Sequence, residues 1–428
     1  MKTLSRLLLL CFMCLLPAAF AQTMPPLNRN AWNIVFVQSF EASPTTNNLS
    51  AQGFNHALLF GQLLNTITAG KSADVRQIGS LASKSNPQDM TAIQSIEPYA
   101  VLNNRGVSHT VVNSGGITAY NSPAYIINNI LSNQPHGNYI MAMPAAMINS
   151  TVAALSDPTA PVVSLTPGNT NQYLVLSVEN ARTAVTVYED NIKPAAHYPD
   201  LNLKPTAHYA CPQSPVTFTA AKPKTSKFQF NTGQTVLFVR HVEAHPNSAF
   251  ENGNFVCQGE WRAIGANKIL LDKIGGKVNN ILTTNPGNLI GCDSNCAYVR
   301  PSLTISPFTI AHQQPLTLAG FQWNDAPTLA ASLFTQNTPY SSQAFNQATT
   351  LVAWEHEHIQ EAFQYLFNTL YQNPEAAQKI PQWSFTDYDT LWKLQTNDKG
   401  DITFSNSCEG IDSNALPSTC PAFPVGTK

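Results

Sequence analysis

The residues best suited to chemistry are Arg240 and His241, which stand side by side after the apolar run of residues 235–239. Such a run is typical of a strand buried in a parallel sheet. Open α/β sheets build their binding sites at the carboxyl ends of such strands. A fixed cation beside an imidazole nucleophile suits phosphoryl transfer, because the transferred group spreads negative charge over several oxygens.

The octapeptide of residues 240–247 reads RHVEAHPN and resembles the signature of the histidine phosphatase superfamily, R-H-G-E-x-x-x-N. The match consists of Arg240, His241, Glu243 and Asn247. The departure is Val242, where the family has Gly. A β-branched residue restricts the approach of backbone to phosphate, so Val242 favours an alternative function, a non-catalytic protein that binds phosphate or a phospholigand.

Three later segments resemble further elements of this family, in the same order along the chain. Residues 258–263 read QGEWRA, like the start of the helix after the signature. Arg300, with Thr304 four residues later, resembles the second pocket element. Residues 350–359 resemble the last catalytic strand, which delivers a second pocket histidine, here His356.

The resemblance implies a phosphoric monoester hydrolase that works through a phosphohistidine on His241. Arg240, Arg300 and His356 would stabilise the transferring phosphoryl group, and Asn247 would add a neutral hydrogen bond. The guanidinium groups suit this role because their planar forks match phosphate geometry and stay charged at any working pH. The expected partner is a phosphate-ester substrate, and no cofactor is expected.

The general acid is predicted to be Glu357, since the acid phosphatase branch of the family places a carboxylic acid directly after the second pocket histidine. A raised pKa would let it protonate the leaving oxygen. Glu355, Glu243 and a carboxylate from the segment between residues 300 and 356 are the alternatives.

The run Glu355-His356-Glu357-His358 also contains residue types that bind zinc. The helical zinc motif H-E-x-x-H requires its second histidine at position 360, which is Gln360. His356 and His358 are two residues apart and do not share a helix face. No metal site is therefore predicted.

The first half of the chain reads as a repeat of the second half without its pocket residues. Gln38 and Ser39 stand where the second half has Arg240 and His241. The offset between matched positions grows slowly, from 202 residues (240 minus 38) to 211 residues (356 minus 145), as small loop insertions would produce. The other pocket positions of the first half hold Thr45, Thr91 and Ala145. Features kept in both halves, such as Glu41 and Glu243, are assigned to folding.

Short apolar strands alternate with helical runs, at 259–274, 328–334 and 359–371 among others, which predicts the α/β class. The resemblance implies two tandem domains, each a mostly parallel sheet sandwiched between helices. The predicted organisation is a degenerate, non-catalytic domain over 30–190, a Pro-rich linker over 191–232, a catalytic domain over 233–410 and a tail over 411–428.

The N-terminus predicts export. Lys2 and Arg6 precede the apolar run 7–16, and Ala19-Phe20-Ala21 forms a cleavage site, so residues 1–21 read as a signal peptide and the protein as periplasmic or secreted. No other segment approaches membrane length, so no membrane insertion is expected. The net charge of −2, with 11% charged residues, gives no indication of nucleic-acid binding.

Six cysteines follow the signal segment, an even number that favours disulfides in an oxidising compartment. Proximity along the chain favours the pairs Cys292–Cys296 and Cys408–Cys420. Cys211 and Cys257 then remain to pair with each other.

Overall fold

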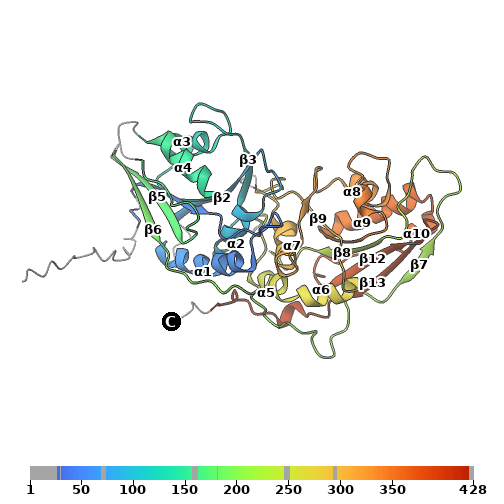
Figure 1. The fold of residues 1–428 in the computed structure, drawn as a ribbon. Coiled ribbons are helices and arrows are strands. Elements are labelled where there is room, and N and C mark those ends of the chain that lie inside the picture. The colour runs from blue at the N-terminus through green and yellow to red at the C-terminus, as the bar shows by residue number, and fades with distance from the viewer. Residues whose placement is uncertain are drawn as a thin grey trace, which may run out of the picture.

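The structure is a computed structural model that describes residues 27–28, 30–68, 74–156, 162–180, 182–244, 251–292 and 296–423. These residues form two mixed sheets with helices on both faces of each, so the predicted α/β class is confirmed (Figure 1). The predicted signal peptide, 1–21, and Asn247 lie outside the described residues. In the described ranges, no helix combines the length and apolar character needed to cross a membrane.

The first sheet, as far as the structure describes it, has six strands in the order β3-β2-β4-β1-β5-β6. The first four of these pair in parallel, and β5 and β6 add antiparallel pairings. The strands are β1 (Trp32–Gln38), β2 (Val75–Ser83), β3 (Ser108–Val112), β4 (Gly137–Met143), β5 (Gln172–Glu179) and β6 (Arg182–Glu189).

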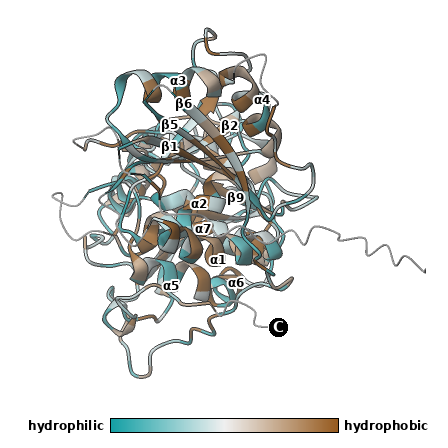
Figure 2. Cartoon of the chain, turned by 90° about the vertical axis from the view of Figure 1, so that its left-hand side faces the viewer, coloured by the Kyte–Doolittle hydropathy of each residue, from teal (hydrophilic) through white to brown (hydrophobic). Residues whose placement is uncertain are grey.

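Alternate residues of β1 face opposite helix layers, as the two-residue period of a strand requires. Val35 and Val37 pack with α1 (Ala51–Ile67) and α2 (Thr91–Leu102). On the other face lie α3 (Pro123–Asn133) and α4 (Ala145–Leu155). Figure 2 shows the strands between α3 and α4 on one side and α1 on the other.

The second sheet, in the described residues, has seven strands in the order β10-β9-β11-β8-β12-β13-β7. Its strands are β7 (Thr217–Ala220), β8 (Thr235–Arg240), β9 (Asn280–Thr283), β10 (Thr317–Leu318), β11 (Thr349–Trp354), β12 (Thr390–Thr396) and β13 (Ile402–Cys408). Its helices are α5 (Cys257–Gly265), α6 (Asn267–Ile274), α7 (Arg300–Ala311), α8 (Ala326–Phe334), α9 (His356–Tyr365) and α10 (Pro374–Ala377). The edge strand β7 comes from the segment 191–232 that was predicted to be a linker.

The two sheets have the same order in their first six strands, with β10, β9, β11, β8, β12 and β13 in the places of β3, β2, β4, β1, β5 and β6. The helices α2 and α7 both have 12 residues, start at Thr91 and Arg300, and contain a proline at the same position, Pro98 and Pro307. This topology agrees with the internal repeat read from the sequence.

The three predicted helical runs differ from the observed helices in their bounds, and the run 328–334 starts earlier, at Ala326, because the Asp325 side chain caps α8. The run 259–274 is divided at Ala266 into α5 and α6, because the backbone of this residue caps one helix and starts the next. The run 359–371 starts earlier, at His356, because the Glu355 side chain caps α9. It ends as a π-helix over Leu366–Leu370.

A shared core joins the halves. The helices α1 and α2 of the first half and α5 and α7 of the second half contribute to one apolar cluster. The Gln94 side chain of α2 donates a hydrogen bond to Ser306 of α7 at 3.0 Å. The described parts of the two halves are thus packed together through their helices.

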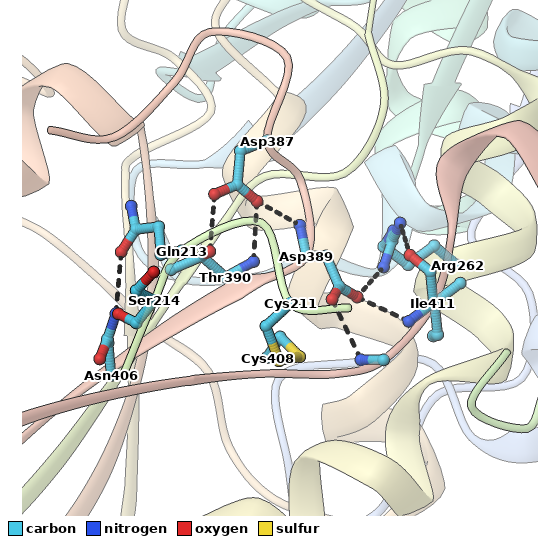
Figure 3. Close-up of a disulfide and its surroundings, with 11 residues drawn as sticks. Cys211, Gln213, Ser214, Arg262, Asp387, Asp389, Thr390, Asn406, Cys408 and Ile411 are labelled. Carbon is cyan, nitrogen blue, oxygen red and sulfur yellow. Dashed lines mark hydrogen bonds and ion pairs between the residues drawn. A yellow bond between two sulfur atoms is a disulfide. The ribbon is translucent and has the colours of Figure 1, made fainter. Parts of the chain in front are cut away.

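The disulfide pairing was predicted correctly only for Cys292–Cys296. The predicted pairs Cys408–Cys420 and Cys211–Cys257 are wrong, because the structure contains Cys211–Cys408 and Cys257–Cys420. Proximity along the chain misled the prediction. The segment after Cys211 runs along the end of β13, where the backbone N–H of Val216 donates to the Asn406 side chain, so Cys211 meets Cys408 there (Figure 3).

Candidate active site

The strands β8 and β11 bring the predicted pocket residues to one edge of the second sheet. They pair in parallel with Arg240 opposite Trp354. The backbone N–H of His241 continues this pairing and donates to the Trp354 carbonyl at 3.0 Å. Glu355 and His356 follow Trp354 directly, so both strands release their polar residues at the same carboxyl edge.

His241 has the protonation state that a nucleophile needs. Its Nδ1 lies 2.8 Å from the Val242 carbonyl, which can only accept, so the proton is assigned to Nδ1 and Nε2 keeps its lone pair. The side chain is buried, and burial together with the positive charges of Arg240 and Arg300 lowers its pKa well below the ordinary value. His241 is therefore a neutral imidazole beside two guanidinium groups.

Arg240 is anchored by the loop before β12. Its Nη1 donates to the carbonyls of Phe385 at 2.6 Å and Asp387 at 3.0 Å. The guanidinium also lies over the Tyr388 ring, 4.1 Å from its centroid. Its buried Nε donates no hydrogen bond within the described residues. A group that accepts hydrogen bonds would satisfy this nitrogen.

Arg300 is the first residue of α7, and its side chain is buried. Its Nε donates to the Asn254 carbonyl at 3.0 Å, and its guanidinium forms an ion pair with Glu251. The sequence did not point to Glu251, since it belongs to no motif. In the structure, its carboxylate contacts Nη2 of the guanidinium group that is predicted to bind phosphate.

Glu355 organises the histidines at the start of α9. Its carboxylate lies against Nδ1 of His356 and 2.6 Å from Nδ1 of His358, and it also caps α9 through the His358 backbone N–H at 3.0 Å. Burial alone would raise the pKa of Glu355, but the contacts with the two histidines outweigh burial and hold it well below its ordinary range. Glu355 is therefore a fixed anion. It orients His356 with Nε2 as the remaining ring nitrogen.

The carboxylates named for the general acid are in different surroundings. Glu357 is exposed in the first turn of α9, directly after His356. Glu243 is buried and forms an ion pair with Arg262 of α5 at 2.7 Å. Glu243 thus holds the signature loop against α5, as its presence in both halves suggested.

Val242 does not project into the pocket. Its side chain is buried in the shared core and lies against α5, where a Cβ on Gly259 would be 2.8 Å from Val242 Cγ2. Its backbone N–H donates to the Thr304 hydroxyl of α7 at 3.0 Å. Thr304 therefore fixes the signature loop as an acceptor, and this bond does not use its O–H.

The first half builds the same loop without the charged residues. The Ser39 backbone N–H donates to the Met143 carbonyl at 3.2 Å, and that of Phe40 donates to the Ser95 hydroxyl at 3.0 Å. Ser95 and Thr304 are equivalent in the repeat. The Thr91 hydroxyl, in place of the Arg300 guanidinium, donates to the Ser39 hydroxyl at 3.0 Å.

Comparison with known proteins gives similarity at the level of structure. No family model and no curated protein matches the sequence. The histidine phosphatase SixA, solved with tungstate, is 15% identical over 37% of this chain and 97% of its own, with a TM-score of 0.27. A mycobacterial glucosyl-3-phosphoglycerate phosphatase is 12% identical over 37% and 98%, with a TM-score of 0.25. A mutant phosphoserine phosphatase from Entamoeba histolytica, solved with phosphoserine, is 10% identical over 40% and 94%, with a TM-score of 0.23.

Proposed function

We propose that the protein is an exported phosphomonoesterase that acts through a phosphohistidine on His241. The observation that carries this proposal is the state of His241, a neutral imidazole with Nε2 available beside Arg240 and Arg300. A nucleophile without charge attacks a phosphate dianion more readily when fixed cations lower the negative charge at the reaction centre.

The reaction has two steps. In the first, Nε2 of His241 forms a bond to phosphorus while the bond from phosphorus to the leaving oxygen breaks, and an acid protonates that oxygen. The imidazole then carries a positive charge, which the Val242 carbonyl stabilises through the bond with Nδ1. In the second step, water attacks phosphorus, its proton returns to the carboxylate, and inorganic phosphate leaves with His241 neutral again.

Arg240, Arg300 and His356 would hold the equatorial oxygens through both steps. The Arg300 guanidinium contacts Glu251 through Nη2, so it would bind phosphate through Nη1 or by exchanging the contact with Glu251. Asn247, which lies outside the described residues, keeps its proposed role as a neutral hydrogen-bond donor.

For the general acid, the surroundings support Glu357. Glu355 is held as an anion by the two histidines, and Glu243 is engaged by a buried arginine. Glu357→Gln should lower kcat for an alkyl phosphate far more than for para-nitrophenyl phosphate, whose leaving group needs no proton. Equal losses with the two substrates would exclude Glu357, and the same comparison on Glu251→Gln would then test that carboxylate.

The domain assignment follows the same reasoning. We propose that 233–410 is a catalytic histidine-phosphatase domain and that 30–190 is its degenerate, non-catalytic counterpart, joined by 191–232 and followed by a tail, 411–428. Export through the signal peptide 1–21 is supported by the disulfides, which are typical of proteins in oxidising compartments.

The decisive experiment is turnover of para-nitrophenyl phosphate by the mature protein in the presence of a chelator. His241→Ala should abolish it, and acid-labile phosphate should be trapped on the wild type alone. Ser39→Ala, the matched change in the first half, should leave turnover unchanged. Absence of wild-type turnover, or turnover that survives His241→Ala, would contradict the proposal. Binding of inorganic phosphate without turnover would instead select a non-catalytic phospholigand-binding protein.

A further inference from the structure

Aromatic side chains surround the charged groups of the candidate site. They come from three separate segments of the second half. The set comprises Tyr298, Trp323, Phe385 and Tyr388.

Phe385 is the outermost of these rings. Its side chain is 52% exposed, although large apolar residues in this protein are mostly buried. Its ring centroid lies 5.9 Å from that of His356 and 5.6 Å from the Arg240 guanidinium. The Phe385 carbonyl accepts the 2.6 Å hydrogen bond from Arg240, so its backbone is tied to the phosphate-binding side chain. The ring therefore has a fixed place beside the site, and among the described residues about half of its surface is left uncovered.

Tyr388 lines the same side of the site. Its ring centroid lies 6.0 Å from that of His241 and 4.1 Å from the Arg240 guanidinium. Because Phe385 and Tyr388 belong to one loop, both rings move with the backbone that anchors Arg240.

A second pair of rings comes from the segments that precede α7 and α8. The Tyr298 centroid lies 6.4 Å from that of His241 and 4.8 Å from that of Trp323. Trp323 in turn lies 4.8 Å from the His358 ring, which Glu355 holds. Tyr298 is buried and Trp323 is half-buried, so this pair extends from the nucleophile toward solvent.

We propose that the site is selective for aryl phosphate monoesters, whose aromatic leaving group packs against Phe385 while the phosphoryl group meets Arg240 and His241. The inference rests on the proposed phosphatase function and adds the substrate class. A leaving group attached to a phosphorus at His241 must leave past the neighbouring side chains. Of the described rings around the site, Phe385 is exposed and Trp323 is half-buried, so these reach its exposed end. Aromatic pairs gain from edge-to-face or offset stacking in addition to the area they bury.

The test compares two substrates in two variants. For the wild type, kcat/KM is measured with phenyl phosphate and with glycerol phosphate, and the ratio is compared with that of Phe385→Ala. The intrinsic reactivity of each ester cancels in this comparison. We expect the ratio to fall about 3- to 10-fold in Phe385→Ala, which corresponds to the loss of one aromatic contact. Phe385→Leu, which keeps apolar bulk without a ring, should show a smaller part of that fall.

A matched control is Tyr120→Ala, which removes an exposed ring, 78% exposed, from the first half and should leave the ratio unchanged. Inhibition by inorganic phosphate should also be unchanged in Phe385→Ala, because the main-chain bond to Arg240 remains. If both esters are hydrolysed and Phe385→Ala alters both kcat/KM values equally, the substrate class is wrong and the phosphatase function stands. If the wild type hydrolyses neither ester, the phosphatase function itself fails, and this inference with it.

Discussion

The two halves of the chain hold equivalent loops with different residues at the ends of β1 and β8. Gln38 and Arg240 both donate to backbone carbonyls close to the start of the neighbouring strand in the sheet order, β5 or β12. Gln38 Nε2 meets the carbonyls of Asn169 at 2.8 Å and Gln172 at 2.6 Å, whereas Arg240 meets those of residues 384–387. A neutral amide is enough to hold the loop in the first half, so an anionic ligand, as proposed above, would account for the charge on Arg240.

A second contrast is the buried basic residue that pairs with the loop glutamate, which stands at equivalent positions of α1 and α5. In the first half, His56 is buried between Glu41 at 3.1 Å and Asp190 at 3.0 Å. In the second half, Arg262 is buried among Glu243 at 2.7 Å, Asp389 at 3.2 Å and Glu409 at 2.7 Å. Figure 3 shows Arg262 and Ile411 bonded to Asp389, near the Cys211–Cys408 disulfide. The half that contains Arg240 and Arg300 thus also has more charged groups around its buried basic residue, three carboxylates compared with two.

Replacing the buried basic residue of each half, Arg262 or His56, should give the largest difference between the halves, measured as loss of stability. Arg262→Leu leaves three buried carboxylates without their cation and should lower the free energy of unfolding by about 3–5 kcal/mol. His56→Leu should cost less, because Glu41 is partly exposed and keeps a hydrogen bond from Thr170 at 2.8 Å. Urea unfolding of both variants at neutral pH measures the difference. Equal losses would show that the two supports are equivalent.

Replacing Arg240 by the glutamine found at the equivalent strand end of the first half tests whether this arginine is needed for catalysis or for folding. Arg240→Gln introduces the residue of the first half, which can still bond the loop carbonyls. We expect kcat/KM to fall about 10²- to 10³-fold, as for loss of a donor to a developing charge, with little change in melting temperature. Gln38→Met should leave turnover unchanged. A melting temperature that collapses in Arg240→Gln would assign this arginine to folding.

The two halves share the pattern Q-G-x-x-x-A, at residues 52–57 and 258–263, and its two glycines should behave alike. A Cβ at Gly53 would lie 2.2 Å from the Glu41 carbonyl oxygen, and one at Gly259 would lie 2.6 Å from that of Glu243. Gly53→Ala and Gly259→Ala should therefore each cost about 1–3 kcal/mol of stability by overpacking. Thermal unfolding checks this. A variant that unfolds like the wild type would mean that its helix can move away from the loop at no cost.

The smallest expected effect concerns pH. The stability contributed by His56 should depend on pH near neutrality, whereas that contributed by Arg262 should not. Burial lowers the pKa of His56, but its bonds to Asp190 and Glu41 outweigh burial and raise the pKa above 6.5. The stabilisation by protonated His56 is present below pH 6.5 and is lost as pH rises through the raised value. Arg262 stays charged throughout this range.

We therefore expect the stability difference between wild type and His56→Gln to shrink as pH rises from 6.5. Urea unfolding at a series of pH values measures it. A difference that stays constant would show that His56 does not change its charge on folding in this range. Arg262→Gln, measured in the same series, provides the matched variant whose deficit should not follow a histidine titration.

Part of the site was open to prediction because it is local in sequence. Arg240 and His241 are adjacent and follow a recognisable apolar strand, and His356 follows another, so the carboxyl edge of a parallel sheet brings them together. The role of Glu243 followed from its retention as Glu41 in the half that lacks the charged residues. The residues that could not be predicted are joined to the site only by folding. Glu251 and Phe385 belong to no motif, and Glu355 was recognised as a candidate acid rather than as the fixed anion it is.

By itself, the sequence determined the α/β class, the alternation of strands and helices in two similar halves, and the strand ends that carry Arg240, His241 and His356. These features follow from local periodicity, because the residues that start or end a strand or a helix are close to one another in the sequence. Only the tertiary structure decided the two long-range disulfide pairs, the proton on Nδ1 of His241, the charge state of Glu355 and the ring of Phe385 beside His356. The disulfide pairs and the place of Phe385 depend on contacts between segments distant in the chain, whereas the states of His241 and Glu355 depend on burial and on the local geometry at the strand ends. Neither leaves a pattern in the order of residues.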